Sequence, residues 1–293
     1  YLKGISTNDF PEALESLLGP SSKGLSSGTI CRLKEKWGEE CKAFQEKDFS
    51  KERYAYLYAD GVYFQTRLSE RQCMLVLLGV DETGQKELLA LESGLRESEA
   101  CWSGLLLRLK DPPCLAIGDG ALGFWKALHK VFDGKVKVQR CWFHKAGNVL
   151  SYLPKSLKLK ANKDLQEIWK SPTFKKASKA FDRFVRIYKD KYPKATECLE
   201  KDREVLLSFY DYPAAHWRSL RTTNAIESVF ATVKLRTAKT RGCLSQKTAE
   251  MMAFKLMESA SKRWIRLCDA EKVDDVLNGI IFIDGEKQDQ ENL

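Results

Sequence analysis

The sequence predicts a mixed α/β fold, and three observations support this prediction. Segments 54–64, 74–84 and 86–94 are rich in apolar and aromatic residues, as consecutive strands are. From 99 to 140, helical and strand patterns alternate, which indicates strands joined by helices. From 145 to 210, apolar residues recur at helical spacing without any strand signal. We therefore expect a single sheet with flanking helices and an all-helical segment after it.

Composition excludes a disordered or membrane-spanning chain. Of 293 residues, 43% are hydrophobic and 30% are charged, as in globular proteins. No run approaches the roughly 18 uncharged apolar residues that a membrane span needs. The sequence opens without the basic and apolar pattern of a signal peptide, so we expect a cytoplasmic protein. The nine cysteines are scattered singly, so we expect free thiols.

The positive charge is concentrated late in the chain. The net charge is +9, and segment 151–210 alone carries +7. Segment 228–248 holds five basic residues and no acid. A solvated helical face could look similar, but a stretch this long without any acid favours a polyanionic partner.

The first fifty residues are predicted to be helical. A short amphipathic helix ends at Gly19, a Ser/Gly turn follows, and a longer helix carries Ile30, Leu33 and Trp37 on one face. Two helices around such a turn resemble a helix-turn-helix. Most helical hairpins bind no DNA, so both interpretations stay open.

The strand segments place two acids beside glycines. Segment 54–64 carries Asp60, and the next two strands form an antiparallel meander through a tight turn. After a helix at 99–109, a short apolar run ends in Asp119 between two glycines. A helix through 132 and a strand at 135–140 follow. An acid in a glycine-opened turn can bind a metal ion or cap the next helix.

A third acid, Glu227, lies in the first turn of a helix that begins near 222–224. Together with Asp60 and Asp119, it could supply the oxygen ligands that Mg²⁺ or Mn²⁺ prefers. Two such ions can promote in-line displacement at phosphorus. The three acids are therefore candidate metal ligands for phosphoryl transfer.

Four sequence blocks, in this order, resemble the Mutator-type transposases of bacterial insertion sequences: YADGVYF, AIGDGALGFWKAL, QRCWFHK and TTNAIESVFATVKLRT. The likeness extends from about residue 6 to 264. It implies a ribonuclease-H-like core with a mixed five-stranded sheet, flanking helices and an all-helical insertion before the catalytic glutamate. By position, the implied Asp-Asp-Glu triad, which would bind two Mg²⁺ or Mn²⁺ ions, is Asp60, Asp119 and Glu227. The family's Cys-x-x-His motif falls on Cys141 and His144.

The resemblance also predicts how the chain is divided. We expect a helix-turn-helix-like region (1–50), the first part of the core (51–150), the insertion (151–218), the last part of the core with the glutamate helix (219–270) and a C-terminal tail (271–293). Family members usually have more sequence before the first aspartate, including a DNA-binding region. Recognition of transposon ends by this chain is therefore left open.

Several neighbours of the acids are candidate supporting or DNA-contacting residues. Cys141 and His144 supply only two ligands, which do not complete a zinc site, so a supporting role near the acids is favoured. Asn224 is predicted to cap the glutamate helix. Trp142 could stack on a base or pack in the core. The predicted contacts with DNA phosphates come from basic side chains: Arg221, Lys234, Arg236, Lys239 and Arg241.

The resemblance implies a DNA transposase that cuts transposon ends and joins the freed 3′-hydroxyl to target DNA. Its partner would be double-stranded DNA, bound by a homodimer or larger assembly in the bacterial nucleoid. Two alternatives remain: a nuclease or resolvase that cuts without joining, and a domesticated DNA-binding protein without catalysis.

Overall fold

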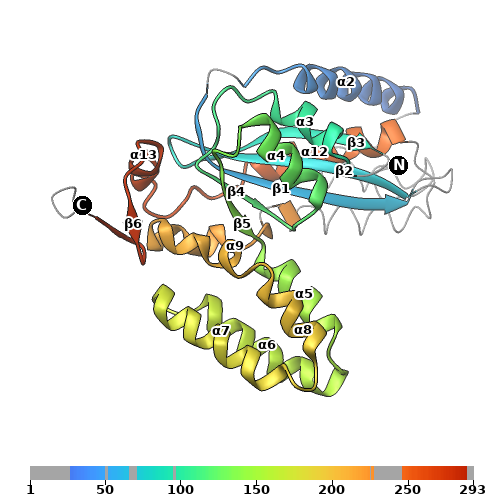
Figure 1. The fold of residues 1–293 in the computed structure, drawn as a ribbon. Helices are drawn as coiled ribbons and strands as arrows, with labels where there is room; N and C mark the ends of the chain where they lie inside the picture. The colour runs from blue at the N-terminus through green and yellow to red at the C-terminus, as the bar shows by residue number, and fades with distance from the viewer. Residues whose placement is uncertain are drawn as a thin grey trace.

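The computed structural model describes residues 27–49, 52–65, 71–94, 97–224, 226–227 and 246–288. A five-stranded sheet in the order β3–β2–β1–β4–β5 forms its centre (Figure 1). The first three strands form an antiparallel meander, and the last two add parallel to β1. The predicted mixed sheet is therefore confirmed. The strands are β1 (Tyr54–Gln65), β2 (Arg71–Asp81), β3 (Lys86–Gly94), β4 (Leu115–Gly118) and β5 (Lys137–Arg140).

Strand β1 is buried on both faces. Its alternating side chains divide between two core clusters, with Tyr56 and Tyr58 in one and Leu57 and Ala59 in the other. Helices α3 (Glu99–Leu106) and α4 (Leu122–Val131) cover the Leu57 face, and α5 (Trp142–Ser151) and α12 (Gln246–Ser261) contribute to the other cluster. This double burial makes β1 a rigid base for the residues that it carries.

A helical region extends away from the sheet after α5 (Figure 1). In α7, Ala177, Phe181, Phe184 and Tyr188 recur at helical spacing and are buried, which explains why this face packs. The helical character expected for 145–210 is confirmed, and among the described residues no helix has the length and apolarity that a bilayer span needs. The elements are α6 (Lys155–Trp169), α7 (Phe174–Tyr188), α8 (Pro193–Glu200), α9 (Arg203–Leu207), η1 (Ser208–Asp211), η2 (Ala214–His216) and α10 (Trp217–Leu220).

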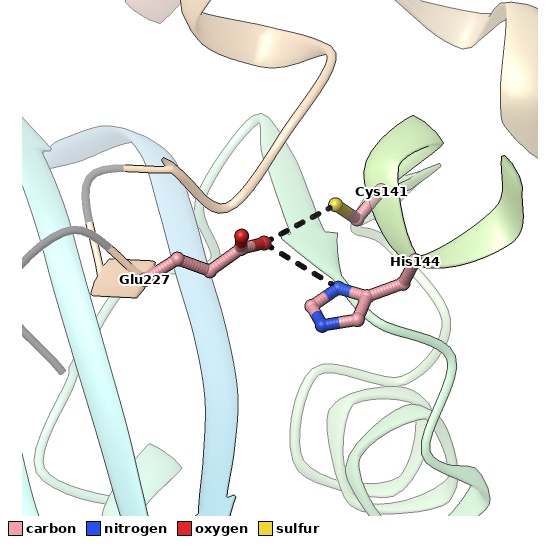
Figure 2. Close-up of side chains that lie close together, drawn as sticks. All are labelled: Cys141, His144 and Glu227. Atoms are coloured by element: carbon pink, nitrogen blue, oxygen red, sulfur yellow. Dashed lines mark hydrogen bonds and ion pairs between the residues drawn. The ribbon is translucent and has the colours of Figure 1, made fainter. Parts of the chain in front are cut away.

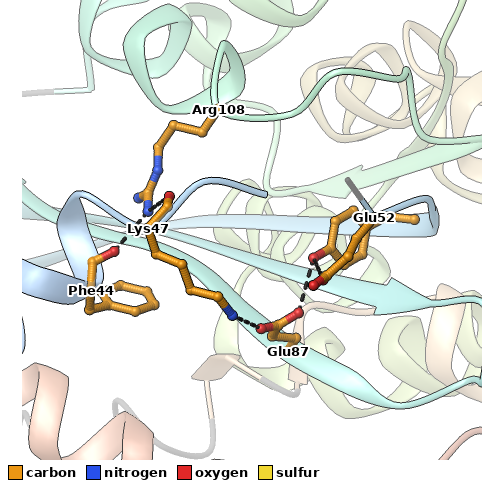
Figure 3. A network of polar contacts seen from close by, with 6 residues as sticks. Phe44, Lys47, Glu52, Glu87 and Arg108 are labelled. Atoms are coloured by element: carbon orange, nitrogen blue, oxygen red, sulfur yellow. Dashed lines mark hydrogen bonds and ion pairs between the residues drawn. The ribbon is translucent and has the colours of Figure 1, made fainter. Parts of the chain in front are cut away.

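A polar network fixes the connection between α2 (Ser27–Gln45) and the sheet (Figure 3). The Arg108 guanidinium donates to the carbonyls of Phe44 and Lys47, at 2.9 Å each. Lys47 in turn pairs with Glu87 at the start of the edge strand β3, at 2.5 Å. The longer N-terminal helix is present, as predicted, and this network anchors its end to the sheet. The shorter helix expected before it lies outside the described residues.

The segment that we expected to be a C-terminal tail, 271–293, contains regular structure. It contains α13 (Lys272–Leu277) and a hairpin of β6 (Phe282–Ile283) and β7 (Glu286–Lys287). Phe282 is buried, and Gly285 exchanges backbone hydrogen bonds with Tyr210 and Ala214. A few apolar anchors in an otherwise polar stretch therefore suffice to fold 272–288 onto the chain.

Candidate active site

Strand register brings Asp60, Asp119 and Cys141 side by side. Ala59 pairs with Gly118 across β1 and β4, and Gly118 pairs with Arg140 across β4 and β5. The next residue on each strand therefore lies at the same level of the sheet. The Cys141 N–H donates to the Gly118 carbonyl at 2.8 Å, which extends the pairing by one step. Asp60 was expected at a strand end, but β1 continues past it to Gln65, and only β4 and β5 end here.

Asp119 stabilises the turn that follows β4. Its Oδ1 accepts a hydrogen bond from the Ala121 N–H at 2.8 Å. Gly120 has a φ of +94°, and a Cβ there would collide with the Arg140 guanidinium. The Asp119 side chain therefore shapes the turn before α4, although the N-cap of α4 is Ala121. One oxygen makes this contact, and a carboxylate has further acceptor positions.

Glu227 reaches the same end of the sheet through segment 221–223. The Arg221 carbonyl accepts from the Trp142 N–H at 2.8 Å, so this segment crosses the start of α5. The Thr223 carbonyl then accepts from the Glu227 N–H at 3.1 Å, and its hydroxyl donates to Glu227 Oε1 at 2.9 Å. Asn224 is exposed and already helical, so Thr223 holds the cap position that was predicted for Asn224.

Cys141, His144 and Glu227 form a tight cluster (Figure 2). Glu227 Oε1 lies 4.0 Å from Cys141 Sγ and 3.6 Å from His144 Nδ1. One potential ligand atom from each residue lies within 4.8 Å of the others. The Thr223 N–H also donates to Cys141 Sγ at 3.4 Å, and the Thr223 hydroxyl, which donates to Glu227, lies 3.5 Å from the same sulfur. Cys141 and His144 therefore touch a predicted catalytic acid, as a supporting role requires.

The charges around Asp60 are predominantly negative. Asp60 is only 6% exposed. Burial is the main cause that raises its pKa to about 7; Asp119, Glu227 and Glu97 raise it further, while His144 opposes them. Burial would lower the pKa of His144, but contacts with Cys141, Asp60 and Glu227 outweigh it and raise that pKa to about 9. An imidazolium thus balances only part of the acidic charge.

The three predicted acids meet at one end of the sheet, but they do not form one compact group. Asp119 and Glu227 both act electrostatically on Asp60. Among the described residues, however, the tight cluster of potential ligands joins Glu227 to Cys141 and His144, and the aspartates lie outside it. The expected convergence on a single point is therefore only partly present.

The position of Trp142 decides between the two roles considered for it, stacking on a DNA base and packing in the core. Its side chain is fully buried, its Nε1–H donates to the Leu206 carbonyl at 2.8 Å, and its ring packs against Trp169. A DNA base cannot reach it in this arrangement, so the alternative of core packing describes it.

The predicted phosphate contacts fall into two groups. The Arg221 guanidinium lies over the rings of Phe209 and Trp217, at 4.6 and 5.6 Å from their centroids. Burial lowers its pKa. Whether it also contacts a phosphate stays a prediction. The remaining candidates lie outside the described residues: Lys234, Arg236, Lys239 and Arg241.

Two residues at this end of the sheet were missed by sequence reasoning. Thr223 was seen only as part of a capping stretch, yet its hydroxyl contacts both Glu227 and Cys141. Glu97 precedes a helix cap, where an acid is unremarkable, yet its charge acts on Asp60. Neither role has a local sequence signal, because both depend on contacts between distant segments.

The proteins that this chain resembles in sequence are transposases of insertion sequences. The model of a family described as "Transposase, Mutator family" matches residues 1–267. The transposase for insertion sequence element IS6120 of Mycolicibacterium smegmatis is 47% identical over 97% of this chain and 89% of its own length. The transposase for IST2 of Acidithiobacillus ferrooxidans is 46% identical over 94% of each chain. The transposase for IS905 of Lactococcus lactis is 28% identical over 82% of this chain and 61% of its own.

Proposed function

The chain belongs to the Mutator family of transposases, and from this premise we propose that it cuts the ends of an insertion sequence and joins them to target DNA. We further propose that the sheet is a ribonuclease-H-like core and that the helices after α5 are an insertion in it. The strand order β3–β2–β1–β4–β5 supports this proposal. The observation that carries it is the parallel register that sets Asp60 beside Asp119 while Glu227 returns to the same end.

The residues present fit a divalent metal site. Its donors are carboxylate oxygens, which Mg²⁺ and Mn²⁺ prefer. Asp60 is buried among like charges, an arrangement that a bound cation would stabilise. Asp60, Asp119 and Glu227 would hold the ions. When bound, two ions would supply Lewis-acid stabilisation of the attacking and leaving oxygens.

The protein's own residues would position the acids and the DNA. In the first step, water attacks the phosphorus, the P–O3′ bond breaks, and the departing 3′ oxygen takes up a proton. In the second step, that 3′-hydroxyl attacks a target phosphodiester and displaces another 3′ oxygen. Thr223 and the imidazolium of His144 would orient Glu227 through the contacts already described. The rigid sheet would keep Asp60 and Asp119 in place for both steps.

We propose that basic side chains flanking the acids bind the DNA backbone. The helices between 155 and 200 expose many lysines, and segment 228–248 adds five basic residues without an acid. Replacing Lys234, Arg236, Lys239 and Arg241 with alanine should weaken binding to all DNA sequences alike. Each lost phosphate contact should reduce the slope of log affinity against log salt by about 0.9. An unchanged slope would place the DNA elsewhere.

The direct test is incubation with the terminal DNA of the element, with Mg²⁺ or Mn²⁺, followed by mapping of nicks and joined products. A transposase should nick at the element end and produce joined strands, and Asp119→Asn should do neither. Nicks without joined products would favour the nuclease or resolvase. Binding without nicks would favour a DNA-binding protein.

A further inference from the structure

Glu97 occupies a position that two glycines make available. It immediately precedes Ser98, whose hydroxyl accepts from the Cys101 N–H at 3.2 Å and caps α3. A Cβ at Gly61 would lie 2.3 Å from Glu97 Cδ and Oε1, so the carboxylate covers this glycine. A Cβ at Gly123 would lie 2.4 Å from the Glu97 carbonyl oxygen. Any larger residue at either glycine would force Glu97 to move.

These glycines belong to the two segments that carry the predicted aspartates. Gly61 directly follows Asp60 on β1, and Gly123 lies in the first turn of α4, shortly after Asp119. Glu97 therefore lies between the two segments that carry Asp60 and Asp119. The electrostatics agree with this placement, because Asp60 responds to the charge of Glu97, and Glu97 responds to that of Asp119.

The Glu97 carboxylate is incompletely satisfied. The Tyr63 hydroxyl is hydrogen-bonded to it. Its Oε2 atom, however, is buried and has no hydrogen-bond partner among the described residues. Of the charges that act on its pKa, Asp119 raises it and His144 lowers it. A buried carboxylate oxygen without a partner costs about 1–3 kcal/mol or more, so its retention indicates a ligand.

We propose that Glu97 is a fourth carboxylate of the metal site and binds the divalent cation, directly or through one water, beside Asp60 and Asp119. This inference rests on the proposed function, because it assumes the cation that the other acids would hold. A hard cation would satisfy the free oxygen and offset the repulsion among the carboxylates. The alternative is a purely structural residue that fixes the entry into α3.

The test measures Mn²⁺ binding to the intact protein, using the electron paramagnetic resonance signal of the free ion as the readout. Glu97→Gln keeps the shape and the hydrogen bond from Tyr63 but removes the charge. It should weaken Mn²⁺ binding at least about tenfold. Without added cation, its melting temperature should equal or exceed that of the wild type, because a buried like charge is gone. The matched control is Glu99→Gln, two residues on, which removes a surface ion pair with Lys130 and should bind Mn²⁺ normally.

A second variant tests the glycine contact without changing any charge. Gly61→Ala should displace Glu97 and weaken Mn²⁺ binding, but it should add little to Glu97→Gln in the double variant. An equal loss from Gly61→Ala in both backgrounds would show that it acts through Asp60, and would contradict the proposed contact.

The outcomes separate this inference from the proposed function. If Asp60→Asn and Asp119→Asn lose Mn²⁺ while Glu97→Gln binds it normally, Glu97 is not a ligand and the proposed function stands. If Glu97→Gln melts earlier and binds Mn²⁺ normally, the structural alternative holds. If none of these variants affects Mn²⁺ binding, the metal site itself is wrong, and this inference fails with it.

Discussion

Two groups of partly or fully buried charges lie near the end of β5, and they differ in how their charges are paired. In the first, Lys145 is fully buried and its Nζ contacts Asp202 Oδ2 at 2.5 Å, while Arg140 Nε lies 3.2 Å from the same oxygen. In the second, Asp60, Asp119, Glu227 and Glu97 face one histidine. The first group, which we call the paired group, sets two cations against one carboxylate of the chain and links α5 to the α8–α9 junction. The second has four acids and, among the described residues, one histidine as their countercharge; we call it the acidic group and propose that a cation from outside completes it.

This difference predicts opposite responses to mutation. Removing the carboxylate from the paired group leaves its cations without a partner, which destabilises the fold. Removing a charge from the acidic group should relieve repulsion and preserve the fold, but it would remove a proposed metal ligand. Measurements of stability and of activity on such variants should therefore distinguish the two groups.

The largest expected effect is on catalysis. Asp60→Asn, Asp119→Asn or Glu227→Gln should each reduce cleavage and joining on the order of a thousandfold or more, since an amide keeps the shape but loses the charge that binds the cation. DNA binding should change little, because the proposed contacts with the DNA backbone come from basic side chains and not from these acids. Gel-based cleavage and binding assays on the same DNA measure both. A variant with near-normal cleavage would exclude that residue as a ligand.

The paired group should give the largest effect on stability. Asp202→Asn leaves Lys145 buried without its carboxylate and should lower the free energy of unfolding by about 3–5 kcal/mol. The control is Asp182→Asn, which breaks the exposed pair with Arg203 and should cost less than about 1 kcal/mol. Urea titrations provide both values. Equal losses in the two variants would mean that Lys145 does not depend on Asp202.

Sequence reasoning recovered the acids better than their surroundings. The Asp-Gly pairs and the strand patterns predicted that Asp60 and Asp119 lie at strand segments, but not that β1 and β4 are neighbours in the sheet. The partnership of Lys145 with Asp202 was out of reach, because it joins an ordinary lysine to an acid in a distant loop. The position of Glu97 depends on Gly61 and Gly123, whose proximity appears only once the sheet and α4 are packed.

The same limit explains the corrections. Trp142 follows a strand at the presumed site, which suggested a DNA contact, but its burial depends on Trp169 and the Leu206 carbonyl in the helical region. The hairpin near Phe282 escaped notice because its strands have only two residues each, too few for a periodic pattern.

A smaller effect on cleavage is expected from changes at Cys141, which lies in the cluster with His144 and Glu227. The Thr223 N–H already donates to its sulfur and the Thr223 hydroxyl lies 3.5 Å from it, which favours a supporting role over zinc binding. Elemental analysis should therefore find no stoichiometric zinc, and Cys141→Ser should fold normally with a modest loss of cleavage. One tightly held zinc ion per chain that disappears in Cys141→Ser would overturn this role.

His216 provides a buried contact without net charge, for comparison with both groups. Its Nε2–H donates to the Asp269 carbonyl at 3.3 Å, so Nδ1 accepts from the Tyr56 hydroxyl at 2.7 Å. Burial lowers the pKa of His216 below its usual 6.5. The unfolded chain therefore binds the proton at higher pH, and the stability that this histidine contributes is complete above about pH 6.5 and lost as pH falls further.

Urea unfolding between pH 8 and 5 tests this contribution. The difference in the free energy of unfolding between the wild type and His216→Asn should shrink as the pH falls. Parallel pH curves for the two proteins would show that His216 does not titrate in this way.

The most direct test of the contrast between the two groups is calorimetric titration of Mn²⁺ into the wild type, into Asp60→Asn/Asp119→Asn and into Asp182→Asn. The wild type and Asp182→Asn should bind the ion with the same affinity and gain thermal stability, while the double variant should do neither. Binding by the double variant at wild-type affinity, or no binding by the wild type, would contradict the claim that the acidic group is completed by a cation.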